Sequence, residues 1–139
     1  NKSFRNACSK VGVPMLLFEG GKSFNIHSTI TNTGVNGAKR VLHHLGMLNS
    51  RFKVSQPKVK ALVIDESKWL RAKYSGMFKV TVDINTYVEK GQVIGNITDP
   101  YGSFNYFVKA PNAGYIFNLN ESPIIYQGDA IFHITTKFQ

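Results

Sequence analysis

The sequence predicts an α+β fold in which a strand and a helix, the end of an α/β layer, precede a small all-β domain. Two patterns support this prediction. The first 50 residues contain a short apolar run and a stretch of helical periodicity, and residues 75–139 contain short alternating segments punctuated by glycine. We expect three regions: 1–50, the end of an α/β domain; 51–74, a basic linker with the first strand of the β-domain; and 75–139, a β-barrel or sandwich.

The composition is that of a globular protein. Of the 139 residues, 42% are hydrophobic and 18% are charged, which is unlike a disordered chain. The longest apolar run, residues 13–18, is far shorter than the roughly 20 residues that a membrane span needs, so we expect no membrane association. The single cysteine, Cys8, excludes an internal disulfide and a cysteine-rich metal site, and it favours a reducing, cytoplasmic location.

The first region combines an apolar run with a helix. Val11–Phe18 reads as a buried strand that ends at Glu19, before two glycines where the backbone is expected to turn sharply. Helical periodicity from about Asn32 to Leu48 predicts a helix, with Thr31, Asn32 or Thr33 as its N-cap. Its apolar stripe consists of Ile30, Val35, Ala38, Val41, Leu42, Leu45 and Leu48. Because one strand and one helix cannot bury a sheet, the region is expected to end a domain that begins upstream.

Basic residues are concentrated ahead of the β-domain. Residues 1–73 carry 13 of the 17 Lys and Arg residues but 3 of the 8 acids. Such an excess can attract nucleic acid, acidic lipid or an anionic substrate, or it can be a solvated surface or one that faces an acidic partner. Arg51–Lys60 alternates basic and apolar residues like a strand edge, and Ala61–Ile64 reads as a strand. No RNA-binding signature accompanies the basic residues, so we expect no nucleic-acid partner.

An internal repeat at an offset of 37 residues is the strongest pattern in the chain. Each copy alternates apolar residues, makes a turn before a glycine and alternates again, which indicates one buried face per strand. Two such halves need each other to close a core, which favours a small two-fold barrel or sandwich. The matched pairs are Phe78 with Tyr115, Val80 with Phe117, Val82 with Leu119, Val88 with Ile125, Gly91 with Gly128, Ile94 with Ile131 and Ile97 with Ile134.

The repeat resembles the biotinyl/lipoyl-type barrel. Val108–Ile116, which contains Ala110-Pro111-Asn112-Ala113-Gly114, is similar to the Ala-Pro-x-x-Gly strand of that family, and the match covers roughly Ser75–Ile134. Carrier domains of this type hold their cofactor on a lysine at the hairpin tip between the two halves. The corresponding stretch here, Thr98–Ser103, has no lysine, and Lys109 lies beyond it. The resemblance therefore implies the carrier fold without the carrier function.

The order of motifs along the whole chain resembles the succinylglutamate desuccinylase/aspartoacylase family. The motifs are Gly12-Val13-Pro14, Phe18-Glu19-Gly20-Gly21, Val41–Leu48, Trp69-Leu70-Arg71-Ala72, Ser75-Gly76 and the barrel. This family has a zinc-carboxypeptidase-like catalytic domain followed by a β-rich C-terminal domain. The resemblance implies that the chain is the C-terminal portion of a zinc-dependent deacylase that cleaves the amide bond of N-acyl amino acids or similar anionic acyl compounds.

The family resemblance assigns the general-base role to Glu19, a lone acid that closes the apolar run. From the residues alone, Glu19 could instead cap a turn or pair with Lys22. The family binds zinc through His-x-x-Glu and a later histidine, all upstream of the catalytic glutamate, and this chain has neither. We therefore expect no metal ligands in this chain, zinc ligands in a missing N-terminal segment, and no activity from the chain alone.

Aromatic residues of the predicted hairpin are the candidate substrate-binding residues. Tyr101, Phe104 and Tyr106 could form a wall over the catalytic mouth, or they could simply pack the hairpin. A non-catalytic β-barrel that docks a partner through its basic linker is the alternative function. The sequence is compatible with a homo-oligomer.

Overall fold

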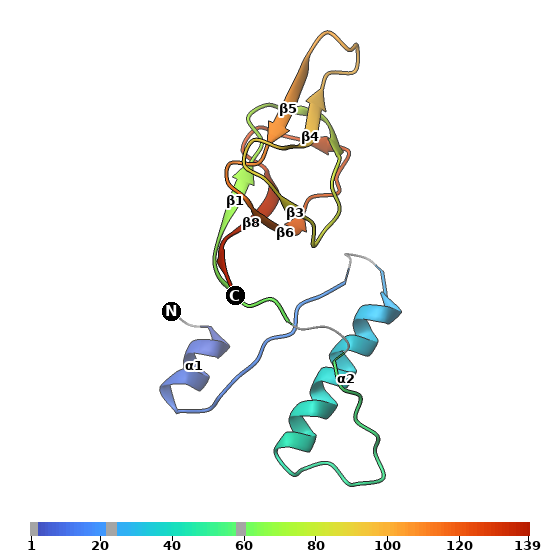
Figure 1. Cartoon of the computed structure of the whole chain (residues 1–139), viewed down its shortest axis with the longest axis vertical. Helices are drawn as coiled ribbons and strands as arrows, with labels where there is room; N and C mark the ends of the chain where they lie inside the picture. Colours follow the sequence, from blue (N-terminus) through green and yellow to red (C-terminus); the bar gives the residue numbers. More distant parts are fainter. Residues whose placement is uncertain (1–2, 22–24, 58–60) are drawn as a thin grey trace. The chain divides into compact units, whose positions relative to one another are not determined.

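The computed structural model describes residues 3–21, 25–57 and 61–139. The protein is a small α+β structure with two helices and two antiparallel four-stranded sheets (Figure 1). The chain divides into two compact units, one up to residue 60 and the other from Ala61 to Gln139. The helices belong to the first unit and the strands to the second. No helix in the described ranges is long and apolar enough to cross a membrane.

The first unit contains helix α1 (Phe4–Lys10), an extended segment, and helix α2 (Ser28–His44). The hydroxyl of Ser3 caps α1 by accepting a hydrogen bond from the amide of Asn6 at 3.3 Å. The prediction of a buried strand over Val11–Phe18 is wrong, because this run lies in no sheet and most of its side chains are exposed. A strand needs a neighbour for its backbone hydrogen bonds, and every described strand belongs to the second unit.

Helix α2 is confirmed, but it begins and ends four residues earlier than predicted. The N-cap is His27, and Thr31 and Thr33 lie inside the helix, where their hydroxyls donate to carbonyls four residues back. The helix ends before Leu48 because Gly46 adopts a left-handed conformation (φ 68°). The amides of Gly46 and Met47 then donate to the carbonyls of His43 and Leu42, which is a Schellman motif.

The apolar stripe of α2 is largely exposed rather than buried. Val35, Val41, Leu42 and Leu45 are all exposed, and neither α1 nor α2 has a buried residue. The first unit therefore lacks a core of its own within the described residues. The predicted strand edge after α2 is also not a strand over residues 51–57, where the Arg51 guanidinium lies 5.0 Å from the Phe52 ring centroid. Residues 58–60 of that prediction fall outside the described residues.

The second unit consists of two antiparallel sheets. Its strands are β1 (Ile64–Arg71), β2 (Gly76–Val80), β3 (Tyr87–Val88), β4 (Val93–Thr98), β5 (Asn105–Lys109), β6 (Gly114–Leu119), β7 (Ile124–Ile125) and β8 (Ala130–Phe138). The first sheet has the order β1-β8-β6-β3 and the second has the order β5-β4-β2-β7. The predicted strand Ala61–Ile64 is wrong in its extent, because β1 begins where that prediction ends.

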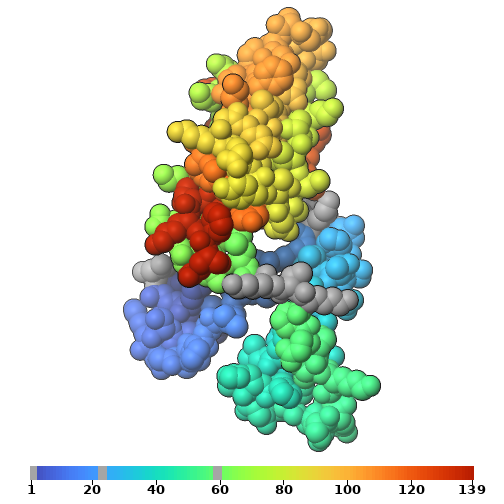
Figure 2. Space-filling model, viewed as in Figure 1, coloured from blue at the N-terminus to red at the C-terminus, as the bar shows by residue number. Residues whose placement is uncertain are grey.

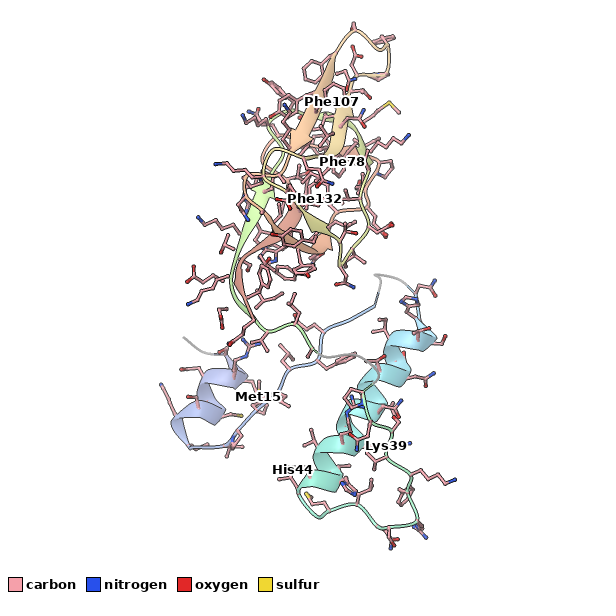
Figure 3. All side chains as sticks on the ribbon, in the orientation of Figure 1. Met15, Lys39, His44, Phe78, Phe107 and Phe132 are labelled. Carbon is pink, nitrogen blue, oxygen red and sulfur yellow. The ribbon has the colours of Figure 1, made fainter. Side chains whose placement is uncertain are left out.

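A single apolar core lies inside the second unit. Figure 2 shows the outer surface of this unit, coloured from green to red, on the face in view. Phe78 and Phe132 pack edge to face at a centroid distance of 5.7 Å (Figure 3). The buried apolar residues are Ala72, Phe78, Val88, Ile94, Ile97, Val108, Ala110, Ile116, Ile125, Ile131, Phe132 and Ile134. In three of the predicted repeat pairs with offset 37, both residues are buried. These pairs are Val88 with Ile125, Ile94 with Ile131, and Ile97 with Ile134.

The two halves of the second unit exchange their short strands. β3 pairs with β6 through Val88 and Gly114, and β7 pairs with β2 through Ile125 and Gly76. A Cβ at Gly76 or at Gly114 would collide with a backbone oxygen, that of Thr98 or Thr135 respectively. Each half therefore contributes to the sheet of the other half.

The offset of the repeat differs in the first strand of each half. Phe78 pairs with Ile97 and Ile116 pairs with Ile134, so the equivalent of Phe78 is Ile116 and not the predicted Tyr115. The register of β6 against β8 also shifts between Ile116 and Asn118. Val80 pairs with Gly95 and Leu119 pairs with Phe132, so the equivalent of Val80 is Leu119 and not the predicted Phe117.

Candidate functional site

Glu19 lies in the extended segment between α1 and α2, and its side chain is exposed. Contacts with α2 hold the residues on both sides of it. A Cβ added at Gly34 of α2 would lie 2.8 Å from the Phe18 ring, and one added at Gly20 would lie 2.6 Å from the Ile30 side chain. A side chain at Gly20 or at Gly34 would therefore require the Ile30 or Phe18 side chain to move, so the close approach of this segment to α2 depends on both glycines.

The residues around Glu19 do not themselves form a metal centre. Within residues 3–21, 25–57 and 61–139, no group of three or more His, Cys, Asp or Glu side chains is placed to hold a metal ion. The described side chains therefore do not fit a zinc ion on their own. Lys22, the alternative partner of Glu19, lies outside the described residues.

The structure separates the three candidate aromatic residues of the β4–β5 hairpin. Tyr101 lies near the tip and is 92% exposed. Phe104 and Tyr106 instead pack edge to face against Tyr74, with centroid distances of 5.1 and 5.0 Å. These aromatic residues belong to the second unit and Glu19 belongs to the first, so the geometry around the aromatic residues and the geometry around Glu19 are those of two separate units.

A hydrogen-bonded turn shapes the tip of this hairpin. The Asp99 carboxylate accepts hydrogen bonds from the Ser103 hydroxyl and from the Phe104 amide. The bond from Ser103 is the main cause that holds the pKa of Asp99 below its ordinary value. The ionised form of Asp99 is therefore the form that these hydrogen bonds at the hairpin tip stabilise.

Tyr106 also lines a groove on the second unit. The groove has a volume of about 540 Å³ and gathers residues from β1, from the β3–β4 turn, from β5 and from β8. Its lining residues are Leu70, Arg71, Lys73, Lys90, Gly91, Tyr106, Phe107, Val108, Lys109, Ala110, Pro111 and Ile131. Sequence reasoning missed this groove because its cationic residues are scattered along the chain; the only signal was Lys109, a lysine just before the Ala-Pro step.

A second aromatic group surrounds His133 on the other sheet. The His133 ring stacks on Trp69 at 4.1 Å and contacts Phe117 at 4.2 Å, and its Nε2 atom lies 2.9 Å from the Ser67 hydroxyl. Burial lowers the pKa of His133 below its usual value. His133 is thus a hydrogen-bonded histidine on β8.

No protein-family model matches the chain, and neither does any curated protein sequence. Solved structures do resemble it. A succinylglutamate desuccinylase/aspartoacylase family protein from Shewanella amazonensis matches 98% of this chain with a TM-score of 0.75 and 16% identity. A succinylglutamate desuccinylase from Silicibacter sp. TM1040 matches 95% of this chain with a TM-score of 0.78 and 17% identity. The ectoine utilization protein EutE (DoeB) from Ruegeria pomeroyi matches 94% with a TM-score of 0.72 and 17% identity.

The chain spans about 40% of the length of these three proteins: 40%, 41% and 40% of the respective chains. The similarity covers both compact units rather than the β-domain alone. At these sequence identities the structural similarity establishes the fold alone. The fold of this chain matches that of one part of structures named for the succinylglutamate desuccinylase/aspartoacylase family.

Proposed function

We propose that this chain is the C-terminal portion of a zinc-dependent hydrolase that cleaves the amide bond of N-acyl amino acids or similar acyl compounds. The observation that carries the proposal is the fold similarity across 94–98% of the chain to structures named as desuccinylase, aspartoacylase-family and ectoine-utilization proteins. The order of motifs around Glu19 and through the β-domain supports the same assignment. A cytoplasmic location is part of the proposal and rests on the lone Cys8.

The second unit is proposed to be the biotinyl/lipoyl-like domain of this enzyme. The exchange of β3 and β7 between the two halves supports this assignment, since it relates the halves by an approximate two-fold. The β4–β5 tip carries Tyr101 and no lysine, so the domain is proposed to cover the catalytic domain rather than to carry a cofactor. An intact mass equal to that of the unmodified chain would agree with this, and a lipoyl or biotinyl mass increment would contradict it.

Glu19 is the proposed general base. Its carboxylate would take a proton from the attacking water and return it to the leaving nitrogen. The zinc ligands are assigned to residues outside this chain, since the described residues do not fit the ion. Zinc bound there would lower the pKa of the water and polarise the acyl carbonyl. The hairpin residues Tyr101, Phe104 and Tyr106 are proposed to limit the size of the acyl group, and the chain alone is proposed to be inactive.

The test begins with the coding sequence upstream of Asn1. An in-frame His-x-x-Glu with a later histidine would support the proposal, and the complete product is then assayed against N-acyl amino acids, including N-succinylglutamate. Glu19→Gln should lower kcat at least a hundredfold while the zinc content stays at the wild-type level, because the general base contributes about 10²–10⁴-fold. Glu66→Gln, which changes an exposed glutamate on β1, is the matched control and should leave kcat unchanged.

Two outcomes would overturn the proposal. Unchanged kcat in Glu19→Gln would remove the general-base assignment. Absence of zinc and of amide hydrolysis in the complete product would favour the alternative, a non-catalytic β-domain that docks a partner through its basic linker.

A further inference from the structure

Apart from Tyr106, no residue that lines the groove has a role in the proposed deacylase chemistry. The groove lies entirely within the second unit, so ligand binding there does not depend on the role of Glu19. We propose that this groove binds a small amphipathic anion, a carboxylate or phosphate joined to a short apolar chain or ring.

The charge of the groove is uniformly positive. Arg71, Lys73, Lys90 and Lys109 line it, and none of its lining residues is acidic. The Arg71 guanidinium is held in place by a hydrogen bond of 2.8 Å to the carbonyl oxygen of Gly128. The Lys73 ammonium lies 5.9 Å from the centroid of the Tyr106 ring. Four cations around one concavity repel one another and raise the local concentration of anions, so a bound anion relieves this repulsion.

The floor of the groove is apolar and rigid. Val108, Ala110 and Ile131 belong to the buried core, and the half-buried Leu70 packs against that core. Backbone hydrogen bonds from Gly91 to Ala110 and from Ala110 to Gln92, at 2.8 and 2.9 Å, hold the β3–β4 turn against the end of β5. The groove is therefore formed before any ligand arrives, which lowers the entropy cost of binding.

The wall on the β5 side is aromatic. Phe107, labelled in Figure 3, is 54% exposed and lies next to Tyr106 along the strand. Phe107 lines the groove together with Lys73, Lys90 and Lys109. An acyl chain or ring of a ligand would remove the apolar surface of Phe107 from water while the acidic group of the ligand meets the lysines. A bare inorganic anion would use only the cations, and a neutral alcohol would use only the floor. The groove fits a ligand that offers both groups.

The experiment titrates the full, ¹⁵N-labelled chain and follows backbone amide shifts. The probes are hexanoate and hexyl phosphate, with hexanol and acetate as controls that lack the charge or the chain. Saturable shifts at Gly91, Val108 and Ile131 with either anionic probe support the proposal, and the tighter of the two identifies the preferred acidic group. Hexanol and acetate should each bind at least fivefold more weakly, because each lacks one of the two contacts.

Two double variants distinguish binding in the groove from a general effect of the positive charge of the protein. Lys90→Gln with Lys109→Gln removes two exposed groove cations and should weaken hexanoate about fivefold. Lys79→Gln with Lys137→Gln removes two exposed strand lysines outside the groove and should change binding less than twofold. Well-dispersed spectra of both variants establish that they fold.

Three results would overturn the proposal. They are equal binding of hexanoate and hexanol, equal weakening by the two double variants, and no groove shifts at about 10 mM probe, where a millimolar site would be largely filled.

Discussion

Adjacent threonines in β8 offer a sharp test of how the second unit is built. The side-chain oxygen of Thr135 accepts a hydrogen bond of 2.9 Å from the Tyr115 amide on β6. The side-chain oxygen of Thr136 is buried and has no partner among the residues that the structure describes. Thr136 lies where the β1–β8 register shifts, between the pairs Glu66–Lys137 and Ser67–Thr135. Substituting valine at each position therefore has opposite expected effects.

Thr135→Val leaves the Tyr115 amide without its acceptor, which costs about 1–3 kcal/mol of unfolding free energy. Thr136→Val replaces an unsatisfied buried hydroxyl with a methyl group and should stabilise the unit by about 1 kcal/mol. For a domain of this size, 1 kcal/mol moves Tm by about 4–8 °C.

Thermal unfolding followed by tryptophan fluorescence is the appropriate assay. The chain has one tryptophan, Trp69 on β1, so the signal reports the second unit. A Tm that falls for Thr135→Val and rises for Thr136→Val would support the register described here. An equal fall in both variants, or a larger fall for Thr136→Val, would refute it.

Three further predictions follow from the same unit. Because the pKa of His133 is lower in the folded state, the unfolded state takes up a proton at this histidine at higher pH than the folded state does. The unfolding free energy should therefore decrease as the pH falls below about 6.5. In urea titrations at pH 7 and pH 5, His133→Phe should remove this decrease. Gly114→Ala should lower the unfolding free energy by about 3 kcal/mol or more, because the new methyl group meets a backbone oxygen. Gly102→Ala has open space around it and should lower the unfolding free energy by only about 1–2 kcal/mol, so equal losses of Tm in the two variants would contradict this. In NMR titrations the midpoint for protonation of the Asp99 carboxyl should lie below its ordinary value of 3.8, and Ser103→Ala should raise this midpoint. An unchanged midpoint in Ser103→Ala would show that the Ser103 hydrogen bond does not lower the pKa of Asp99.

The core of the second unit could be predicted because its signals are local. Alternation with period 2 identifies the buried face of a strand, and residues such as Ile94 and Ile131 are buried as the repeat predicts. The first strand of each half was misaligned because one residue fewer separates Gly114 from Ile125 than separates Gly76 from Val88. Apolar alternation alone does not reveal such a difference in loop length.

The first unit shows what local signals cannot supply. Val11–Phe18 has the composition of a buried strand, but a strand exists only where a neighbouring strand accepts its hydrogen bonds. The start of α2 was misplaced because Thr31 and Thr33 bond to carbonyls within the helix instead of capping it. Gly34 of α2 leaves room for the Phe18 ring, because a Cβ at this position would lie 2.8 Å from that ring.

The candidate site was predictable only in part for the same reason. Glu19 is distinctive in sequence because two glycines follow it. The groove could not be found in this way, because it depends on how β1, β5 and β8 come together and not on the spacing of residues along the chain.

The ends of the second unit lie side by side. The amides of Val63 and Gln139 each donate to the carbonyl of the other residue at 2.9 Å. A short peptide could therefore join these ends with little strain, and new termini could be opened at the exposed hairpin tip beside Tyr101. The unit is thus suited to circular permutation. It is also suited to insertion into a surface loop of another protein, because the two ends of its chain lie beside each other.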